Sequence, residues 1–415
     1  MMASRTRTTA RVALHVLAGA IYAVLLTFTA RRVLFALAIL RRPSGRHSVG
    51  YTAVADSLPN VLILVACRDE AEAIDRLCRD IAALDYPVEK RRLVLVNDGS
   101  RDATAQVMEQ ACQGRSGWSV VSLDSSVGKA AAMNVALRGE PFGEIVYVLD
   151  ADHRPDPSAL KRVVGYFDDP LVAGVNGRMV ACNATASAVA YYATVEGLIH
   201  QLVTMRAKDR LGLAPALLGS NCAYRRRALQ ECGLFRPGAL SEDYDLTLAF
   251  YRQGYRVRFA EDVVSYHEVP EHARGYLKQH VRWGRGIYAV ARNHAWGVAT
   301  QRGLSAAVRL ELLILLAGYL DRAALIGSMV LTGLSALNPR LINFPAAVLA
   351  IVLLTPAAQI ATLFAEQRAD RGMWLRLPLV PLMFGLDVLA AINGLFSAFL
   401  GRPLQWTKTE RMSRQ

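Results

Sequence analysis

Four short apolar runs, separated by segments with a helical pattern, most constrain how this chain can fold. Each run is as short as a strand, and its apolar residues are nearly continuous, as in strands that are buried on both faces. Strands that alternate with helices at this spacing predict a doubly wound α/β sheet, whose ligands bind at the carboxyl ends of the strands. The predicted strands are Val61–Ala66, Leu93–Asn97, Ser119–Leu123 and Ile145–Leu149, and the predicted helices are Glu70–Leu84, Asp102–Gln113 and Lys129–Leu137.

Longer apolar runs flank this central part and predict membrane helices. Roughly 20 apolar residues are needed to cross a bilayer. The run from Val12 to Thr29 lies near the N-terminus, and Leu310–Leu337, Phe344–Phe364 and Leu377–Leu400 follow the central part. We therefore expect an N-terminal membrane segment and linker over residues 1–58, a cytosolic α/β domain over 59–271, interfacial helices over 272–303 and a C-terminal transmembrane region over 304–415.

Charges in the apolar runs leave the membrane topology open. Arg31 and Arg32 interrupt the first run, which resumes after them; a cleaved signal peptide is the alternative interpretation of this segment. Asp321, Arg322 and Asp387 lie inside the later runs, where charges usually face a protein interior or a polar pathway. A bend at the interface near Asp321 is the alternative. One N-terminal and three C-terminal spans would leave both basic termini outside, against the positive-inside rule, so a span is missing from this count or one run is re-entrant.

The overall charge of the chain agrees with membrane anchoring. The net charge is +13, which suits nucleic acid, an anionic membrane surface or phosphorylated ligands. Many arginines flank apolar runs and no nucleic-acid motif accompanies them, so we expect membrane anchoring and no nucleic-acid partner. The six cysteines have no metal-type spacing and suggest no disulfide framework, which suits a cytosolic domain.

Polar clusters follow the predicted strands. Asp69 and Glu70 come after the first strand, and Asp98 after the second. A carboxylate at such a position can accept hydrogen bonds from a base or a ribose hydroxyl, although Asn97–Ser100 alone is also an ordinary turn. Lys129 opens a predicted helix, where it can meet phosphate oxygens.

A pair of carboxylates follows the fourth strand. Asp150 and Asp152 are one residue apart. Two such carboxylates repel each other unless a cation or hydrogen-bond donors hold them, and oxygen ligands favour Mg²⁺ or Mn²⁺, which can bridge a diphosphate. We therefore predict a site for Mg²⁺ or Mn²⁺.

Two later clusters suggest acid–base chemistry and sugar binding. Glu242 and Asp243 follow Ser241 at the start of an apolar-patterned segment. They are either a helix-capping device or the location of a general base that takes a proton from an acceptor hydroxyl. Further along, Gln279, Arg282 and Trp283 offer an amide, a guanidinium for phosphate and an indole for stacking, unless this is only an interfacial helix with snorkelling side chains. The three residues stand in the segment Gln279–Trp283.

The ordered set of these clusters resembles the processive-type inverting glycosyltransferases, the superfamily of cellulose, chitin, hyaluronan and poly-N-acetylglucosamine synthases. The resemblance rests on Asp98, the Asp150-x-Asp152 triplet, the Ser241–Asp243 triplet and the Gln279-x-x-Arg282-Trp283 motif, and it extends over about residues 60–295. It implies an α/β GT-A nucleotide-sugar transferase domain with flanking transmembrane helices.

The resemblance also implies a role for each cluster. Asp98 and Lys129 would contact the uracil nucleotide, with Asp69 and Glu70 beside them. Asp150 and Asp152 would hold the nucleotide and the metal. Asp243 would be the base, with Glu242 next to it, and Gln279, Arg282 and Trp283 would line the diphosphate and acceptor site. Asp69 replaces the usual Asn and Ser241 the usual Thr; both keep their hydrogen-bonding ability, so the departures weaken the prediction of the donor more than that of the reaction class.

The expected activity is hexosyl transfer from a UDP-sugar to the end of a growing β-linked polysaccharide, which is secreted through the membrane region. The expected surroundings are the lipid bilayer of the plasma (inner) membrane, with the catalytic domain in the cytosol and an accessory membrane subunit as a further candidate partner. A lipid acceptor, as in ceramide glucosyltransferases, is the alternative within the enzyme class. A membrane protein that binds nucleotide without chemistry is the alternative outside it.

Overall fold

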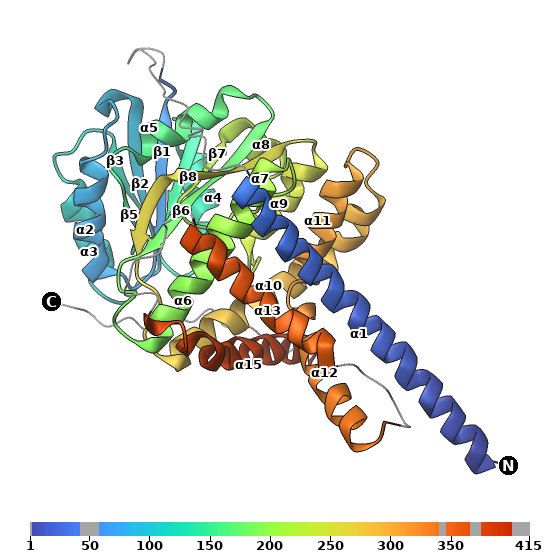
Figure 1. Ribbon diagram of the computed structural model, residues 1–415. Helices are drawn as coiled ribbons and strands as arrows, with labels where there is room; N and C mark the ends of the chain where they lie inside the picture. The colour runs from blue at the N-terminus through green and yellow to red at the C-terminus, as the bar shows by residue number, and fades with distance from the viewer. Residues whose placement is uncertain (1, 42–57, 340–345, 366–374, 401–415) are drawn as a thin grey trace.

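The first four strands form the parallel half of an eight-stranded sheet (Figure 1). The computed structural model describes residues 2–41, 58–339, 346–365 and 375–400. β1 (Val61–Cys67), β2 (Arg91–Asp98), β3 (Trp118–Leu123) and β4 (Ile145–Leu149) are all parallel in the order β3-β2-β1-β4. The helices between them are α2 (Ala71–Ala82), α3 (Thr104–Cys112) and α4 (Lys129–Gly139), so the predicted alternation of strands and helices is confirmed.

The other half of the sheet is mixed, and none of its strands was predicted from the sequence. β7 (Cys222–Arg225) pairs antiparallel with β4 and with β6 (Val172–Ala181). β8 (Arg256–His267) runs parallel to β6 and antiparallel to the short β5 (Arg154–Pro155). Glycine and charged residues interrupt the apolar pattern of β6 and β8, and the ladder between these strands is irregular near Gly177. The sequence pattern therefore did not reveal them as strands.

Apolar side chains on alternate positions of the parallel strands serve two separate cores. Ile63 packs in one core with α2, α3 and α5 (Ala159–Gly165). Leu64 points to the other face and packs in a second core with α4, α8 (Arg226–Glu231) and α9 (Glu242–Arg252). Because both faces of the strands are buried, the apolar runs are continuous instead of alternating.

A long helical segment lies between the sheet and the C-terminal helices. It consists of α6 (Ala188–Leu198), the π-helical turn η4 (Ile199–Met205) and α7 (Arg206–Arg210). Gln201 fastens the π-helical turn to β6, since its side chain accepts a hydrogen bond from the backbone N–H of Met179 (2.7 Å) and donates one to the carbonyl of Met179 (3.0 Å). Such π-helical turns are frequent at functional sites.

The N-terminal apolar run forms one helix, α1 (Met2–Arg41), which extends away from the sheet (Figure 1). The two arginines that interrupt the apolar run, Arg31 and Arg32, do not interrupt the helix, because both guanidinium groups pair with carboxylates on other helices. Arg31 pairs with Glu311 at 2.8 Å, and Arg32 pairs with Asp321. A buried charge is tolerated in a helix when it is paired in this way.

The run expected as one span over Leu310–Leu337 is divided into α11 (Ala306–Ala317) and α12 (Leu320–Leu337). Gly318 has a φ of +46° and ends the first helix, so the chain bends just before Asp321, as the alternative interpretation held. The remaining helices are α10 (Ala273–Thr300), α13 (Ala346–Ala365) and α15 (Leu379–Phe399). Arg322 pairs with Asp321 (2.9 Å) and with Asp387 (3.1 Å), which neutralises the charges within these helices.

Two helical segments of the described residues are long and apolar enough to cross a membrane: Arg11–Arg41 in α1 and Leu320–Leu337 in α12. A shorter apolar segment, Met383–Gly394, lies in α15. Length and composition alone are weak evidence for a membrane span, and the predicted run Phe344–Phe364 begins outside the described residues.

Candidate active site

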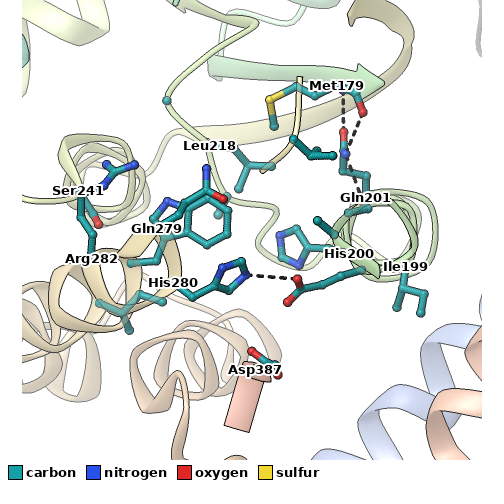
Figure 2. Close-up of a pocket in the computed structure, with 18 of the residues that line it drawn as sticks. Met179, Ile199, His200, Gln201, Leu218, Ser241, Gln279, His280, Arg282 and Asp387 are labelled. Atoms are coloured by element: carbon teal, nitrogen blue, oxygen red, sulfur yellow. Dashed lines mark hydrogen bonds and ion pairs between the residues drawn. The ribbon is translucent and has the colours of Figure 1, made fainter. Parts of the chain in front are cut away.

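A cavity of about 1600 Å³ begins at the carboxyl ends of the parallel strands and continues between the C-terminal helices. All the site residues predicted from the sequence line it except Asp69. Its part nearest the sheet is polar and charged, with Glu70, Asp98, Lys129, Asp150, Asp152, Glu242 and Asp243 in the wall. Its far part is mostly apolar, with Leu25, Phe28, Leu325, Met329, Ile360, Phe364 and Phe384 in the wall, and the same helices add the charged residues Arg31, Arg32, Asp321, Arg322 and Asp387. Figure 2 shows the middle of the cavity, where Gln279, His280 and Arg282 of α10 lie opposite His200 and Gln201.

The loops after β1 and β2 support each other. Asp69 accepts a hydrogen bond from the backbone N–H of Arg101 (2.7 Å), and its own N–H donates to Ser100 Oγ (3.0 Å). Glu70 donates its backbone N–H to Thr104 Oγ1 (2.8 Å). Asp69 therefore joins the two loops, while Glu70 faces the cavity.

The carboxylate of Asp98 is buried and shapes the loop before α4. It accepts hydrogen bonds from Ser126 Oγ (2.8 Å) and from the backbone N–H groups of Val127 (2.7 Å) and Gly128 (3.0 Å). The loop comes so close that a Cβ on Gly99, which has a φ of +63°, would lie 2.5 Å from the nitrogen of Ser126. The Asn97–Ser100 turn thus places Asp98 at the cavity and fixes the start of α4.

Lys129 joins two of the predicted carboxylates. Its Nζ lies 2.6 Å from Asp150 Oδ1, 2.9 Å from the carbonyl oxygen of Gly219 and 3.5 Å from Glu242 Oε1. Burial disfavours the ammonium, but Asp150 and Glu242 outweigh it and raise the pKa of Lys129 above its usual value. The lysine is therefore a fixed positive charge in the cavity.

Asp243 has the protonation behaviour of a base that works near neutral pH. Burial raises its pKa to about 7, and the charge of Glu242 adds to this effect, while the backbone N–H of Tyr244 and the charge of Lys129 oppose it. Ser241 occupies the N-cap position of α9, but its side chain makes no capping hydrogen bond. The capping interpretation therefore lacks the bond on which it depends.

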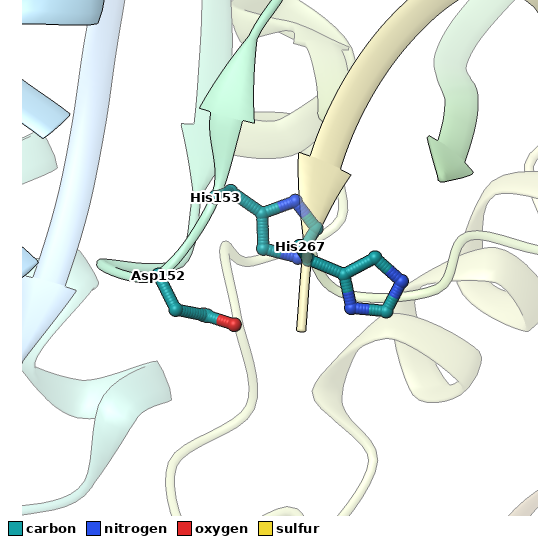
Figure 3. Close-up of side chains that lie close together, drawn as sticks. All are labelled: Asp152, His153 and His267. Atoms are coloured by element: carbon teal, nitrogen blue, oxygen red, sulfur yellow. The ribbon is translucent and has the colours of Figure 1, made fainter. Parts of the chain in front are cut away.

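Asp152 lies beside two histidines, as Figure 3 shows. One carboxylate oxygen of Asp152 and one ring nitrogen each of His153 and His267 lie within 4.8 Å of one another. The two rings stack with their centroids 5.1 Å apart, and His153 Nδ1 lies 3.0 Å from Ser265 Oγ. A mixed set of carboxylate and imidazole suits Mn²⁺ better than Mg²⁺. His267 was not predicted from the sequence, because it lies at the end of β8 and that strand was not predicted.

The two halves of the site define a class of enzyme. The parallel half of the sheet carries the loops with Asp98 and Asp150, and the other half is joined to α9 with Glu242 and Asp243. This mixed α/β arrangement is a GT-A glycosyltransferase fold. Residues 59–286, more than half of the chain, match the family model described as "Glycosyltransferase like family 2". The chain belongs to this family and is a glycosyltransferase.

Similar proteins include two curated bacterial enzymes. The chain is 30% identical over 297 residues to the N-acetylglucosaminyltransferase of Rhizobium meliloti (strain 1021), a match that covers 69% of this chain and 67% of that protein. It is 27% identical over 240 residues to the poly-beta-1,6-N-acetyl-D-glucosamine synthase of Staphylococcus aureus (strain COL), a match that covers 57% of this chain and 56% of that protein. The chain thus spans about half to two thirds of the length of these relatives.

A solved structure shares the fold over nearly the whole chain. It is the mannosyltransferase PcManGT from Pyrobaculum calidifontis in complex with GDP-Man and Mn²⁺, with a TM-score of 0.64 and 21% sequence identity. The similarity covers 95% of this chain and 100% of that chain. The helices that follow the sheet are therefore part of the shared fold.

Gly219 offers a test of how closely Asp243 must be positioned. A Cβ on Gly219, which has a φ of +83°, would lie 3.1 Å from Asp243 Oδ2, whereas a Cβ on Gly212, with a φ of +63°, would have no neighbour within 4 Å. Both alanine variants carry backbone strain of about 1–2 kcal/mol. We expect Gly219→Ala alone to lower kcat, roughly ten- to a hundredfold, because it displaces the carboxylate. Steady-state kinetics beside thermal melting checks this, and equal kcat values for the two variants would contradict it.

Proposed function

We propose that this glycosyltransferase transfers a sugar from a UDP-sugar, with inversion, to the terminal hydroxyl of a growing β-linked polysaccharide. The observation that carries the proposal is Asp243, a partly buried carboxyl whose pKa loss of solvation raises to about 7, in the same cavity wall as Lys129 and Trp283. The polymer acceptor is supported by the relatives named as an N-acetylglucosaminyltransferase and a poly-beta-1,6-N-acetyl-D-glucosamine synthase.

The reaction is a single displacement. Asp243 takes the proton of the acceptor hydroxyl, whose oxygen bonds to the anomeric carbon from the face opposite the diphosphate. The bond between that carbon and the diphosphate oxygen breaks, and UDP leaves with the electron pair. Lys129 and Arg282 stabilise the charge that develops on the diphosphate, because an ammonium and a guanidinium form charge-assisted hydrogen bonds with phosphate oxygens. Trp283, which is 41% exposed, stacks on the acceptor sugar and holds it at the distance the base needs.

A divalent cation is part of the proposal. Asp152, His153 and His267 would hold it, and their mixed carboxylate and imidazole donors fit Mn²⁺. Asp150, the other ligand predicted from the sequence, pairs with Lys129. When bound, the cation would neutralise negative charge on the diphosphate.

The membrane setting is also a proposal. We place the boundaries at residues 58/59, 271/272 and 303/304, with α1 and α12 in the plasma (inner) membrane and the sheet in the cytosol. The apolar composition of the two segments and the exposed apolar side chains of α1, such as Val16 and Leu34, support this. Secretion of the product and an accessory subunit stay predictions.

A lipid-linked acceptor is the second candidate, and the apolar far part of the cavity favours it. Met329 of α12 lines this part and is half exposed, and Leu325 of the same helix and Phe384 of α15 line it too. Hydroxyl groups without partners are costly in such surroundings, whereas a hydrocarbon chain fits them. Product analysis after incubation with UDP-sugars distinguishes the candidates: a product that partitions into butanol supports the lipid acceptor, and a water-soluble polymer supports the polysaccharide.

The base is tested with Asp243→Asn, which keeps the size of the side chain but cannot take a proton. Transfer should fall by roughly 10²–10⁴, while UDP binding measured by calorimetry changes little. In the wild type, kcat should decrease as the pH drops below about 7, since Asp243 becomes protonated. Asp75→Asn, an exposed carboxyl on α2, is the control. If Asp243→Asn turned over at the wild-type rate, Asp243 would not be the base and its role would be structural.

The metal is tested by removal and by His267→Ala. EDTA should abolish transfer, and Mn²⁺ should restore it better than Mg²⁺. His267→Ala should weaken Mn²⁺ binding, followed by electron paramagnetic resonance, and reduce the preference for Mn²⁺, because it removes an imidazole donor. His272→Ala, an exposed histidine before α10, serves as the matched control. Full activity of the chelated enzyme would refute the metal role.

A further inference from the structure

His280 lies in the cavity wall where three helices meet, and the proposed reaction gives it no task. It belongs to α10, between Gln279 and Trp283, and is only 2% exposed. Glu196 of α6 and Asp387 of α15 face it, and single atoms of the three side chains lie within 4.8 Å of one another. Figure 2 shows a dashed line from the ring to a carboxylate of the opposite wall, with Asp387 below both groups.

Both ring nitrogens of His280 face oxygen atoms that act as acceptors. Nδ1 lies 3.0 Å from the carbonyl oxygen of Tyr276, and Nε2 lies 3.1 Å from Glu196 Oε2. The same carboxylate oxygen also accepts a hydrogen bond from the hydroxyl of Tyr276 (2.9 Å). A neutral imidazole has one N–H and can satisfy only one of the two contacts, whereas an imidazolium donates both.

The charges around the ring also require a cation there. Glu196 and Asp387 are two carboxylates at close range in a largely buried place, where they repel each other. Arg322 of α12 neutralises one of them through its 3.1 Å contact with Asp387. Burial disfavours a charged His280, but Glu196, Asp387 and the Tyr276 carbonyl outweigh it and raise the pKa of the imidazole above its usual value. The hydroxyl groups of Tyr192 and Tyr276, which are also near Glu196, stay neutral because burial raises the pKa of each.

The ring of His280 is in contact with the proposed acceptor residue. One neighbour is Tyr276, whose ring stacks on the imidazole with a centroid distance of 3.8 Å and an angle of 21°. The other is Trp283, whose indole lies 4.6 Å away at an angle of 59°. A cation within about 6 Å of an indole attracts it electrostatically. A charged His280 therefore holds the indole of Trp283 in one position at the cavity wall.

We propose that His280 is a positioning residue, an imidazolium held by Glu196 and Asp387 that fixes Trp283 for binding of the acceptor sugar. The inference rests on the proposed function in so far as Trp283 contacts the acceptor. It gives the acceptor site a dependence on pH that is separate from that of the base, since loss of the proton from His280 at alkaline pH would release the indole.

The test is the pH dependence of the acceptor KM in the wild-type enzyme and in His280→Gln. In the wild type, the acceptor KM should rise as the pH increases from 6.5 through the pKa of His280, while calorimetric binding of UDP stays constant. His280→Gln should have a KM for the acceptor that is roughly three- to thirtyfold higher at pH 6.5, the range of a cation–π contact, and no longer dependent on pH. The titration of Asp243 lowers kcat at acid pH, whereas the titration of His280 raises the acceptor KM at alkaline pH. The two effects can therefore be measured separately.

A flat acceptor KM in the wild type between pH 6 and 9 would overturn the proposal, and that measurement needs no variant. A pH profile of His280→Gln that matches the wild type would also overturn it. If His280→Gln does not fold, Glu196→Gln is the second variant. Loss of that carboxylate should lower the pKa of His280 and so move the rise in acceptor KM to lower pH. A rise at the same pH as in the wild type would contradict the proposal. Failure of the proposed function is distinguishable, since the wild type would then release no UDP with any acceptor.

Discussion

The ion pairs of Lys129 are the contacts on which the arrangement of the site depends. Lys129 starts α4, Asp150 follows β4 and Glu242 starts α9, so one ammonium group joins the parallel half of the sheet to the helix that carries Asp243. Without that charge, three carboxylates would face one another in the cavity wall, and their repulsion would favour protonation or separation. The carbonyl of Gly219 shares the same ammonium, so the loop against which Asp243 packs is fixed by the same contact.

The same rule, that a buried charge is kept only with a partner, organises the helices beyond the sheet. Arg31 and Arg32 attach α1 through Glu311 and Asp321, and Arg322 joins α12 to α15 through Asp387. Glu311 also pairs with Lys208, which connects α7 to this group. These helices are largely apolar, and apolar packing alone would allow several arrangements of them. The ion pairs favour the one arrangement that surrounds the far part of the cavity. The charged groups that interrupt the apolar runs in the sequence are thus the contacts that position the helices.

The parallel half of the fold could be predicted from the sequence, because strands buried on both faces have continuous apolar runs. The polar residues that follow these strands all lie at the same edge of the sheet. Glu70, Asp98, Lys129, Asp150 and Asp152 line the cavity because of that geometry, whereas Glu242 and Asp243 were identified through the family resemblance. The antiparallel half did not follow, since β6 and β8 contain glycine and charged residues, and with them His267 was missed. His280 and Glu196 were missed for another reason: their contact joins residues 84 positions apart on helices whose packing no local pattern encodes. The family resemblance gave the reaction class, while the polymer acceptor remains a proposal.

In the proposed reaction one base, Asp243, drives a single displacement, and the configuration of the first product shows whether it does. The experiment incubates the purified protein with a UDP-sugar whose sugar is α-linked to the diphosphate, together with a short saccharide acceptor. Proton NMR then follows the anomeric signal of the transferred residue from the earliest time points. A single displacement inverts that centre, so the account predicts a β-linked product only. A first-formed α-linkage would require two displacements or a front-face route and would contradict the account.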